Sequence, residues 1–176
     1  MTTTSQTYTQ EVLELAGSKV ELIRGGTGDP LVIFHDETGY PGWMRYNEAL
    51  AQSNTLYMPL NPGAGQSENL DWVRSMRDLA IFQLEVLEDL GLGQFNALGL
   101  SFGGWLASEM AAMSPDRFKK LVLVNPMGIL PPSGEILDMF MVVAKEYITK
   151  SFKDPDSTPE FKDICPEEPT PEQNEL

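Results

Sequence analysis

The sequence predicts an α/β fold, a mostly parallel sheet with helices on both faces. Two short runs, residues 31–35 (LVIFH) and 121–125 (LVLVN), are continuously apolar and rich in branched side chains. Such runs are typical of parallel strands buried on both faces. Between them, segments of strand character alternate with segments of helical periodicity. This alternation is the pattern of βαβ units.

The first predicted element is a β-hairpin. Residues 11–15 and 19–24 alternate with period two on either side of Gly17-Ser18, so each strand has one wet face. The following segments are then expected in chain order: a turn at 25–30, a buried strand at 31–35, a helix at 43–52 and a short strand at 55–59. Residues 61–68 (NPGAGQSE) predict a loop because turn-forming residues dominate them.

The strongest helical pattern covers residues 71–90. Apolar side chains recur there at helical spacing, and Gly91 is a typical C-terminal stop; they are Met76, Leu79, Ala80, Leu84, Leu87 and Leu90. A strand at 95–100, a helix of small residues at 103–113 and the buried strand at 121–125 follow. Small side chains allow that second helix to pack close to a sheet.

The character of the sequence changes after Pro131, so two regions are expected, residues 1–130 and residues 131–176. Residues 133–149 predict a helix, whereas residues 152–171 are rich in Pro, Asp and Glu and predict irregular structure. Residues 170–173 (TPEQ) carry a cap residue, a proline at the first helical position and a capping-box glutamine. We therefore expect the sequence to be truncated inside an element.

Composition excludes several classes of function. The 26 acidic and 12 basic residues give a net charge of −14, which repels nucleic acid and anionic membrane surfaces. One cysteine and one histidine exclude an internal disulfide and a Cys/His metal cluster. The N-terminus has no signal-peptide pattern, and no apolar run approaches about 18 residues. We therefore expect a cytoplasmic chain with no metal, nucleic-acid or membrane partner.

The pattern that indicates chemistry is Gly99-Leu100-Ser101-Phe102-Gly103. It fits the G-x-S-x-G nucleophile elbow, in which a strained turn between a strand and a helix exposes a serine hydroxyl. Side chains two residues before and after the serine would collide, so glycine suits both positions. The amides at the start of the following helix point at the site and can stabilise an oxyanion.

The chain resembles the N-terminal part of an α/β-hydrolase over about residues 12–131. The resemblance rests on LVIFHDETGYPGWMRY, on LYMPLNPGAGQSE and on the elbow segment NALGLSFGGWLASEM. It implies the strand order 1-2-4-3-5-6-7-8, a core over residues 1–130 and the beginning of a helical cap over residues 131–176. It also implies acyl transfer to water without a cofactor, with Ser101 as the nucleophile.

The resemblance assigns the oxyanion hole to the backbone amides of Phe102 and Asp36. Asp36 departs from the glycine that is usual there, and its carboxylate would oppose an oxyanion unless it turns away. The loop at Asn61 lacks the family's acidic and arginine residues. His35, the only histidine, matches a residue that anchors the oxyanion turn. A catalytic role for His35 is the alternative that the sequence favours less.

The family's catalytic acid and histidine follow strands 7 and 8, which this sequence lacks. The chain alone is therefore expected to be inactive or very weak, because serine without a base is a poor nucleophile. Residues 121–125 should then form an edge strand, open to self-association or to a partner chain. His35, Trp43 and Trp105 are candidates for a substrate pocket, and packing against the sheet is an equal alternative for Trp105.

Two functions follow from these observations. The first is a serine hydrolase that acts on a small apolar ester or on a C–C bond next to a carbonyl. The alternative is a non-catalytic, hydrolase-like binding module, or a fragment that needs a partner chain. The intact elbow favours the enzyme, whereas the missing base and Asp36 favour the alternative.

Overall fold

The structure is a computed structural model that describes residues 8–134, 136, 141–159 and 161–165. Its contacts divide the chain into two units, Met1–Ile129 and Leu130–Leu176. The first unit holds the sheet and the three helices around it. The second holds two short helices.

The first unit is built on a six-stranded sheet in the order β1-β2-β4-β3-β5-β6. Strands β1 and β2, and β2 and β4, are antiparallel, whereas the pairs formed by β3, β4, β5 and β6 are parallel. The strand bounds are β1 Tyr8–Leu15, β2 Ser18–Gly26, β3 Asp29–Phe34, β4 Asn54–Pro59, β5 Phe95–Leu100 and β6 Phe118–Val124. The predicted fold class is confirmed, and so is the strand order of the six strands.

The hairpin β1–β2 turns through two residues, Ala16 and Gly17, and both have positive φ, 51° and 71°. This is the conformation that a two-residue hairpin favours, because its twist matches the twist of the strands. The amide of Ala16 also donates a hydrogen bond to Oδ2 of Asp89, 2.7 Å away. This contact ties the hairpin to the end of a helix, α2, Met76–Asp89.

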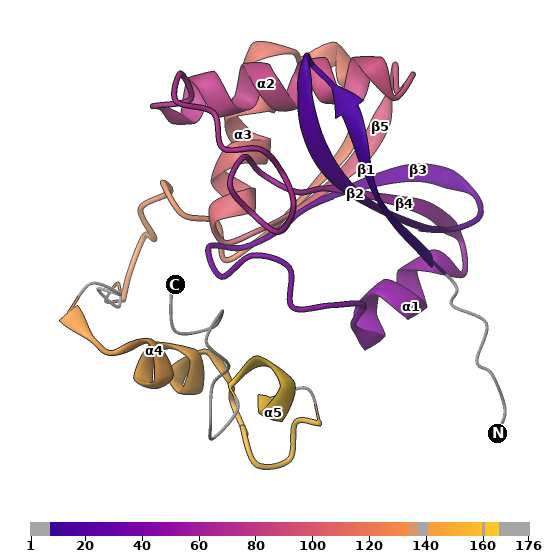
Figure 1. The fold of residues 1–176 in the computed structure, drawn as a ribbon. Coiled ribbons are helices and arrows are strands. Elements are labelled where there is room, and N and C mark those ends of the chain that lie inside the picture. Colours follow the sequence, from indigo (N-terminus) through magenta and orange to yellow (C-terminus); the bar gives the residue numbers. More distant parts are fainter. Residues whose placement is uncertain (1–7, 135, 137–140, 160, 166–176) are drawn as a thin grey trace, which may run out of the picture. The chain divides into compact units, whose positions relative to one another are not determined.

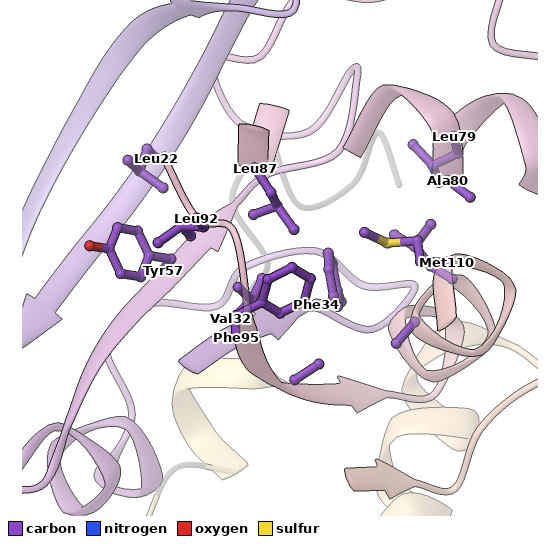
Figure 2. Close-up of a cluster of buried hydrophobic side chains, with 13 residues drawn as sticks. Leu22, Val32, Phe34, Tyr57, Leu79, Ala80, Leu87, Leu92, Phe95 and Met110 are labelled. Carbon is purple, nitrogen blue, oxygen red and sulfur yellow. The ribbon is translucent and has the colours of Figure 1, made fainter. Parts of the chain in front are cut away.

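Helices cover both faces of the sheet. Helices α2 and α3, Phe102–Met113, pack on one face and helix α1, Arg45–Ala51, on the other (Figure 1). Figure 2 shows the core on the α2–α3 side, where Val32, Phe34 and Phe95 lie among side chains of the two helices. Leu31 and Ile33 belong to the cluster on the opposite face. Strand β3 is therefore buried on both faces, as its continuous apolar run predicts.

Helix α2 begins later than its periodicity predicts. It starts at Met76 because Ser75 caps it, with Oγ accepting from the amide of Asp78 at 3.2 Å. A side-chain acceptor at this position satisfies an amide that has no partner inside the helix. In the predicted segment 71–74, residues 71–72 form a turn and residues 73–74 have no regular structure. Two buried helical positions, Leu79 and Leu87, flank Gln83 on the face toward the core.

Strand β6 is the outermost strand at one side of the described sheet. The prediction that this strand is buried on both faces is wrong. Leu121 and Leu123 pack against the α2–α3 core, but Val122 is 53% exposed and Val124 is 44% exposed. Successive side chains of a strand point to opposite faces, so the second face of β6 is open in the described part of the chain.

The second unit differs from its prediction. Its helix α4 spans Ala144–Ser151, so residues 133–134, 136 and 142–143 of the predicted helix 133–149 are not helical. Residues 135 and 137–140 lie outside the described residues. A short helix, α5 Phe161–Ile164, lies in the segment predicted as irregular. The helix start predicted at residues 170–173 lies outside the described residues. Among the helices that the structure describes, none has the length and apolar character to cross a membrane.

Candidate active site

Ser101 occupies a strained backbone conformation between β5 and α3. Its φ is 47° and its ψ is −109°, a combination that costs free energy in any residue other than glycine. Four backbone hydrogen bonds hold it there. Its amide donates to the carbonyl of Val124 at 2.9 Å, and its carbonyl accepts from Gly104, Trp105 and Met127 at 3.0, 3.2 and 3.0 Å. Hydrogen bonds to β6, to α3 and to the segment after β6 therefore hold Ser101 in this strained conformation.

The glycines around Ser101 are required by close backbone packing. A Cβ at Gly99 would lie 2.5 Å from the carbonyl oxygen of Gly103. A Cβ at Gly103 would lie 2.2 Å from the carbonyl oxygen of Phe34 at the end of β3. These distances are far below van der Waals contact, so the helix can approach the strand ends only without side chains. Helix α3 thus starts directly against β3 and β5.

The Ser101 hydroxyl stands at the N-terminus of a 12-residue helix. The side chain is half-buried, and its hydroxyl caps no amide of the helix. The first amides of a helix have no partner inside the helix, and its dipole is positive at this end. The amide of Phe102 is the first of these donors. The arrangement is able to receive negative charge that develops next to the serine oxygen.

His35 lies just past the end of β3, beside this elbow. Register places Phe34 opposite Gly99, and the carbonyl of His35 would be 2.5 Å from a Cβ at Gly103. Both ring nitrogens are engaged: Nδ1 lies 2.7 Å from the carbonyl oxygen of Asp36, and Nε2 accepts from the amide of Asn61 at 3.2 Å. The proton therefore sits on Nδ1, because a carbonyl only accepts and an amide only donates.

The electrostatics of His35 agree with a neutral ring. Burial lowers its pKa below the ordinary value of 6.5, and the backbone and carboxylate of Asp36 offset part of that shift. A neutral, Nδ1-protonated ring can hold the Asp36 carbonyl. It cannot accept a proton at Nε2 without losing the bond to Asn61.

Asp36 begins a tight turn that its own side chain stabilises. Its Oδ1 accepts from the amide of Thr38 at 2.9 Å and from the hydroxyl of Thr38 at 2.6 Å. Asp36 and Gly39 form an isolated antiparallel bridge, with the Gly39 amide donating to the Asp36 carbonyl at 3.3 Å. The carboxylate thus has two donors of its own, and their partial positive charges oppose its field at the elbow.

Residues 25–160 match the family described as the alpha/beta hydrolase fold. The chain belongs to this family. It is 32% identical over 128 residues to 2-hydroxymuconate semialdehyde hydrolase of Pseudomonas sp. (strain CF600), an alignment that covers 70% of this chain and 45% of the relative. It is 34% identical over 140 residues to 2-hydroxy-6-oxononadienedioate/2-hydroxy-6-oxononatrienedioate hydrolase of Burkholderia vietnamiensis, covering 73% of this chain and 49% of the relative.

An ester-acting enzyme is also among the similar proteins. The chain is 34% identical over 104 residues to pimeloyl-[acyl-carrier protein] methyl ester esterase of Nitrosomonas europaea, covering 56% of this chain and 38% of the relative. The crystal structure of Cfl2 from Burkholderia cenocepacia has the same fold, with a TM-score of 0.69, 20% identity and coverage of 90% of this chain and 65% of that chain. The chain spans less than half the length of each of the three named hydrolases.

The two tryptophans predicted from the sequence to line a substrate pocket have different surroundings. Trp105 lies one turn into α3, meets the Phe102 ring at 6.4 Å and 74°, and would contact a Cβ at Gly128 at 3.0 Å. Trp43 instead stacks on Tyr8 at 4.5 Å and donates from Nε1 to Glu48 at 2.8 Å. Among the contacts described, those of Trp105 are at the elbow and those of Trp43 join the α1 side of the sheet to β1.

Sequence reasoning missed the two residues that link His35 to the rest of the hydrolase core. Gln83 is fully buried and Asn61 is 8% exposed, and Nε2 of Gln83 donates to Oδ1 of Asn61 at 3.0 Å. The available signal was the position of Gln83 on the apolar stripe of α2, four residues from both Leu79 and Leu87. An amide on such a stripe needs a buried partner.

The loop that begins at Asn61 is itself anchored to β2. Glu21 is 1% exposed, and its Oε2 accepts from the amide of Gln66 at 2.6 Å. The hydroxyl of Ser67 accepts from the Glu21 amide at 3.0 Å and donates to the carbonyl of Leu60 at 3.2 Å. These contacts anchor the loop at Leu60, Gln66 and Ser67, whereas the Asn61 side chain is held by Gln83.

Proposed function

We propose that Ser101 is the nucleophile of a serine hydrolase that acts on a small, largely apolar ester or on a C–C bond next to a carbonyl. The observation that carries the proposal is the strained conformation of Ser101 at the N-terminus of α3, held by four backbone hydrogen bonds. Strain of this kind persists where the surrounding structure enforces it. Family membership supports the same assignment.

The chemistry follows from the groups around the serine. Oγ of Ser101 attacks a carbonyl carbon while a general base takes its proton, and the carbonyl oxygen becomes an oxyanion. The amides of Phe102 and Asp36 are assigned as its donors, since hydrogen bonds aimed at developing charge lower the barrier most. The base then returns the proton to the leaving group, and water releases the acyl group from Ser101.

The general base belongs outside the residues described here. His35 is the only histidine in the sequence, and Asn61 occupies its Nε2. The chain covers 45% and 49% of two hydrolases to which it is 32% and 34% identical over the aligned residues. We assign the base and its supporting acid to the other part of such an enzyme, so this chain alone should turn over substrate slowly or not at all.

The substrate class rests on the relatives and on the exposed aromatic group near the elbow. Two relatives are named for a semialdehyde and for oxo acids, and one for a methyl ester. All of these compounds present a carbonyl carbon to a nucleophile. Trp105, 39% exposed, with Phe102 offers an apolar wall beside Ser101.

The test is covalent labelling with an alkyl fluorophosphonate. We expect one adduct per chain, mapped to Ser101, and no adduct in Ser101→Ala. Ser108→Ala is the matched control, because its hydroxyl donates to the carbonyl of Gly104 at 2.8 Å in the same helix, and it should label like the wild type. Because the base is assigned to residues outside this chain, slow labelling is compatible with the proposal. An adduct that maps away from Ser101, or labelling of folded protein that is unaffected by Ser101→Ala, would contradict it.

A non-catalytic binding module is the second candidate. The engaged ring of His35 favours it, because both nitrogens already have partners. The same labelling experiment separates the two. Folded protein that binds a carbonyl compound but never forms an adduct at Ser101 supports the binding module.

A further inference from the structure

Three hydrogen bonds join the middle of helix α2 to the turn after β3. Nε2 of Gln83 donates to Oδ1 of Asn61 at 3.0 Å, the amide of Asn61 donates to Nε2 of His35 at 3.2 Å, and Nδ1 of His35 donates to the carbonyl of Asp36 at 2.7 Å. We call Gln83, Asn61, His35 and Asp36 the polar relay. It connects three elements that lie apart in the sequence.

The middle contact of the polar relay sets the last one. While the Asn61 amide points at Nε2, that nitrogen has to be the acceptor, so the ring proton stays on Nδ1. Only this tautomer donates to the Asp36 carbonyl. If Asn61 turns away, Nε2 is free to carry the proton, and Nδ1 then faces the carbonyl as a second acceptor. The Asp36 carbonyl would then lose the hydrogen bond that ties the turn to the His35 ring.

Gln83 is a poor residue for stability at its position. It is fully buried on the stripe of α2 that faces the core, and its Oε1 has no hydrogen-bond partner among the described residues. An orphaned buried acceptor is unfavourable, whereas apolar side chains in place of both partners of a buried hydrogen bond cost little. Stability alone would favour apolar residues at both 83 and 61, so the donor of Gln83 is the group that needs a role.

We infer that Gln83 is a positioning residue that acts through Asn61 and His35 to fix the turn whose amide is assigned to the oxyanion hole. This inference rests on the proposed function for its chemical meaning. The effect of Gln83 on the tautomer of His35 does not depend on the proposed function, because the tautomer can be observed without any reaction. Asn61, the hydrogen-bond partner of Gln83, is a positioning residue of the same polar relay.

The test uses the full chain labelled with ¹⁵N-histidine. The sequence has one histidine, so the spectrum reports His35 alone. In the wild type we expect a protonated Nδ1 and an unprotonated Nε2. In Gln83→Leu we expect the Nε2-protonated tautomer to appear and the rate of fluorophosphonate labelling at Ser101 to fall at least about tenfold. The melting temperature should fall less than in Val86→Ala.

Two further variants separate positioning from packing. Asn61→Ala breaks the same contact from the other side and should give the same spectrum as Gln83→Leu. Val86→Ala removes buried apolar volume from α2 without touching a polar group, so it should lower the melting temperature and leave the spectrum and the labelling rate unchanged.

Two outcomes would overturn the inference. One is a wild-type His35 spectrum in both Gln83→Leu and Asn61→Ala. The other is a loss of labelling that follows melting temperature equally in Gln83→Leu and Val86→Ala. If wild-type Ser101 is never labelled, the proposed function fails, and the His35 spectra still decide whether the polar relay exists.

Discussion

The backbone amide of Asn61 donates a hydrogen bond to Nε2 of His35 across 3.2 Å. This contact joins the ends of β4 and β3 and occupies the nitrogen that a general base would use. His35, which lies beside the proposed nucleophile Ser101, is therefore bound as part of the scaffold. The described residues thus form the elbow around Ser101. We assign the general base that would activate Ser101 to residues outside them.

The neutral state of His35 predicts a pH dependence of stability. Burial lowers its pKa in the folded chain, whereas the unfolded chain takes up the proton near pH 6.5. Below that pH the unfolded state binds more protons than the folded state, so the free energy of unfolding should fall as pH decreases. Urea unfolding of the wild type and His35→Gln at several pH values from 5 to 8 measures this.

His35→Gln should lack that component of the pH dependence. Carboxylates titrate mainly below about pH 5, so the comparison is confined to higher pH. Equal slopes in the two proteins above pH 5, or greater stability of the wild type toward acid, would show that the ring is not held neutral.

The close approach of α3 to β3 predicts a strong effect of a single methyl group. Gly103→Ala should lower the free energy of unfolding by about 1–3 kcal/mol, because its Cβ would overlap the backbone carbonyl of Phe34. Gly93→Ala is the matched control, since nothing lies within 4 Å of a Cβ there, and it should change stability by less than about 0.5 kcal/mol. Equal effects in urea titration would contradict the packing described at the elbow.

The open edge of the sheet predicts self-association. Strand β6 begins with exposed Lys119 and Lys120, but its second half presents the exposed side chains of Val122 and Val124. The other edge strand, β1, carries exposed Glu11 and Glu14 along its length, and charge discourages edge pairing. We expect the chain to associate with a second copy through β6 as concentration rises. Sedimentation of Val122→Lys should show the monomer, and Val12→Lys on β1 should behave like the wild type.

A wild-type chain that stays monomeric at every concentration would refute this expectation. So would equal disruption by Val12→Lys, because that residue lies on the opposite edge of the sheet.

The core of the fold could be predicted because its signals are local. Continuous apolar runs marked the strand before the oxyanion turn, and periodicity marked α2. The glycines at 99 and 103 marked the elbow because backbone packing dictates them, and the structure shows the overlap that any side chain would cause. The roles of Ser101, Phe102 and Asp36 in a reaction remain predictions.

Other features depend on contacts that no local pattern contains. The bond between Gln83 and Asn61 spans 22 residues, and only the folded sheet brings the two side chains together. The exposure of Val122 depends on what covers the second face of β6, which the apolar run itself does not encode. Helix α2 begins at Met76, and not at residue 71 as predicted, because the side chain of Ser75 caps it.

The most direct test of the central claim is a crystal structure of the chain after fluorophosphonate treatment. We expect a phosphonyl group on Oγ of Ser101, with one oxygen about 2.7–3.1 Å from the amide of Phe102 and positive φ retained at Ser101. An adduct whose oxygens avoid the start of α3, or a Ser101 with ordinary helical backbone angles, would contradict it.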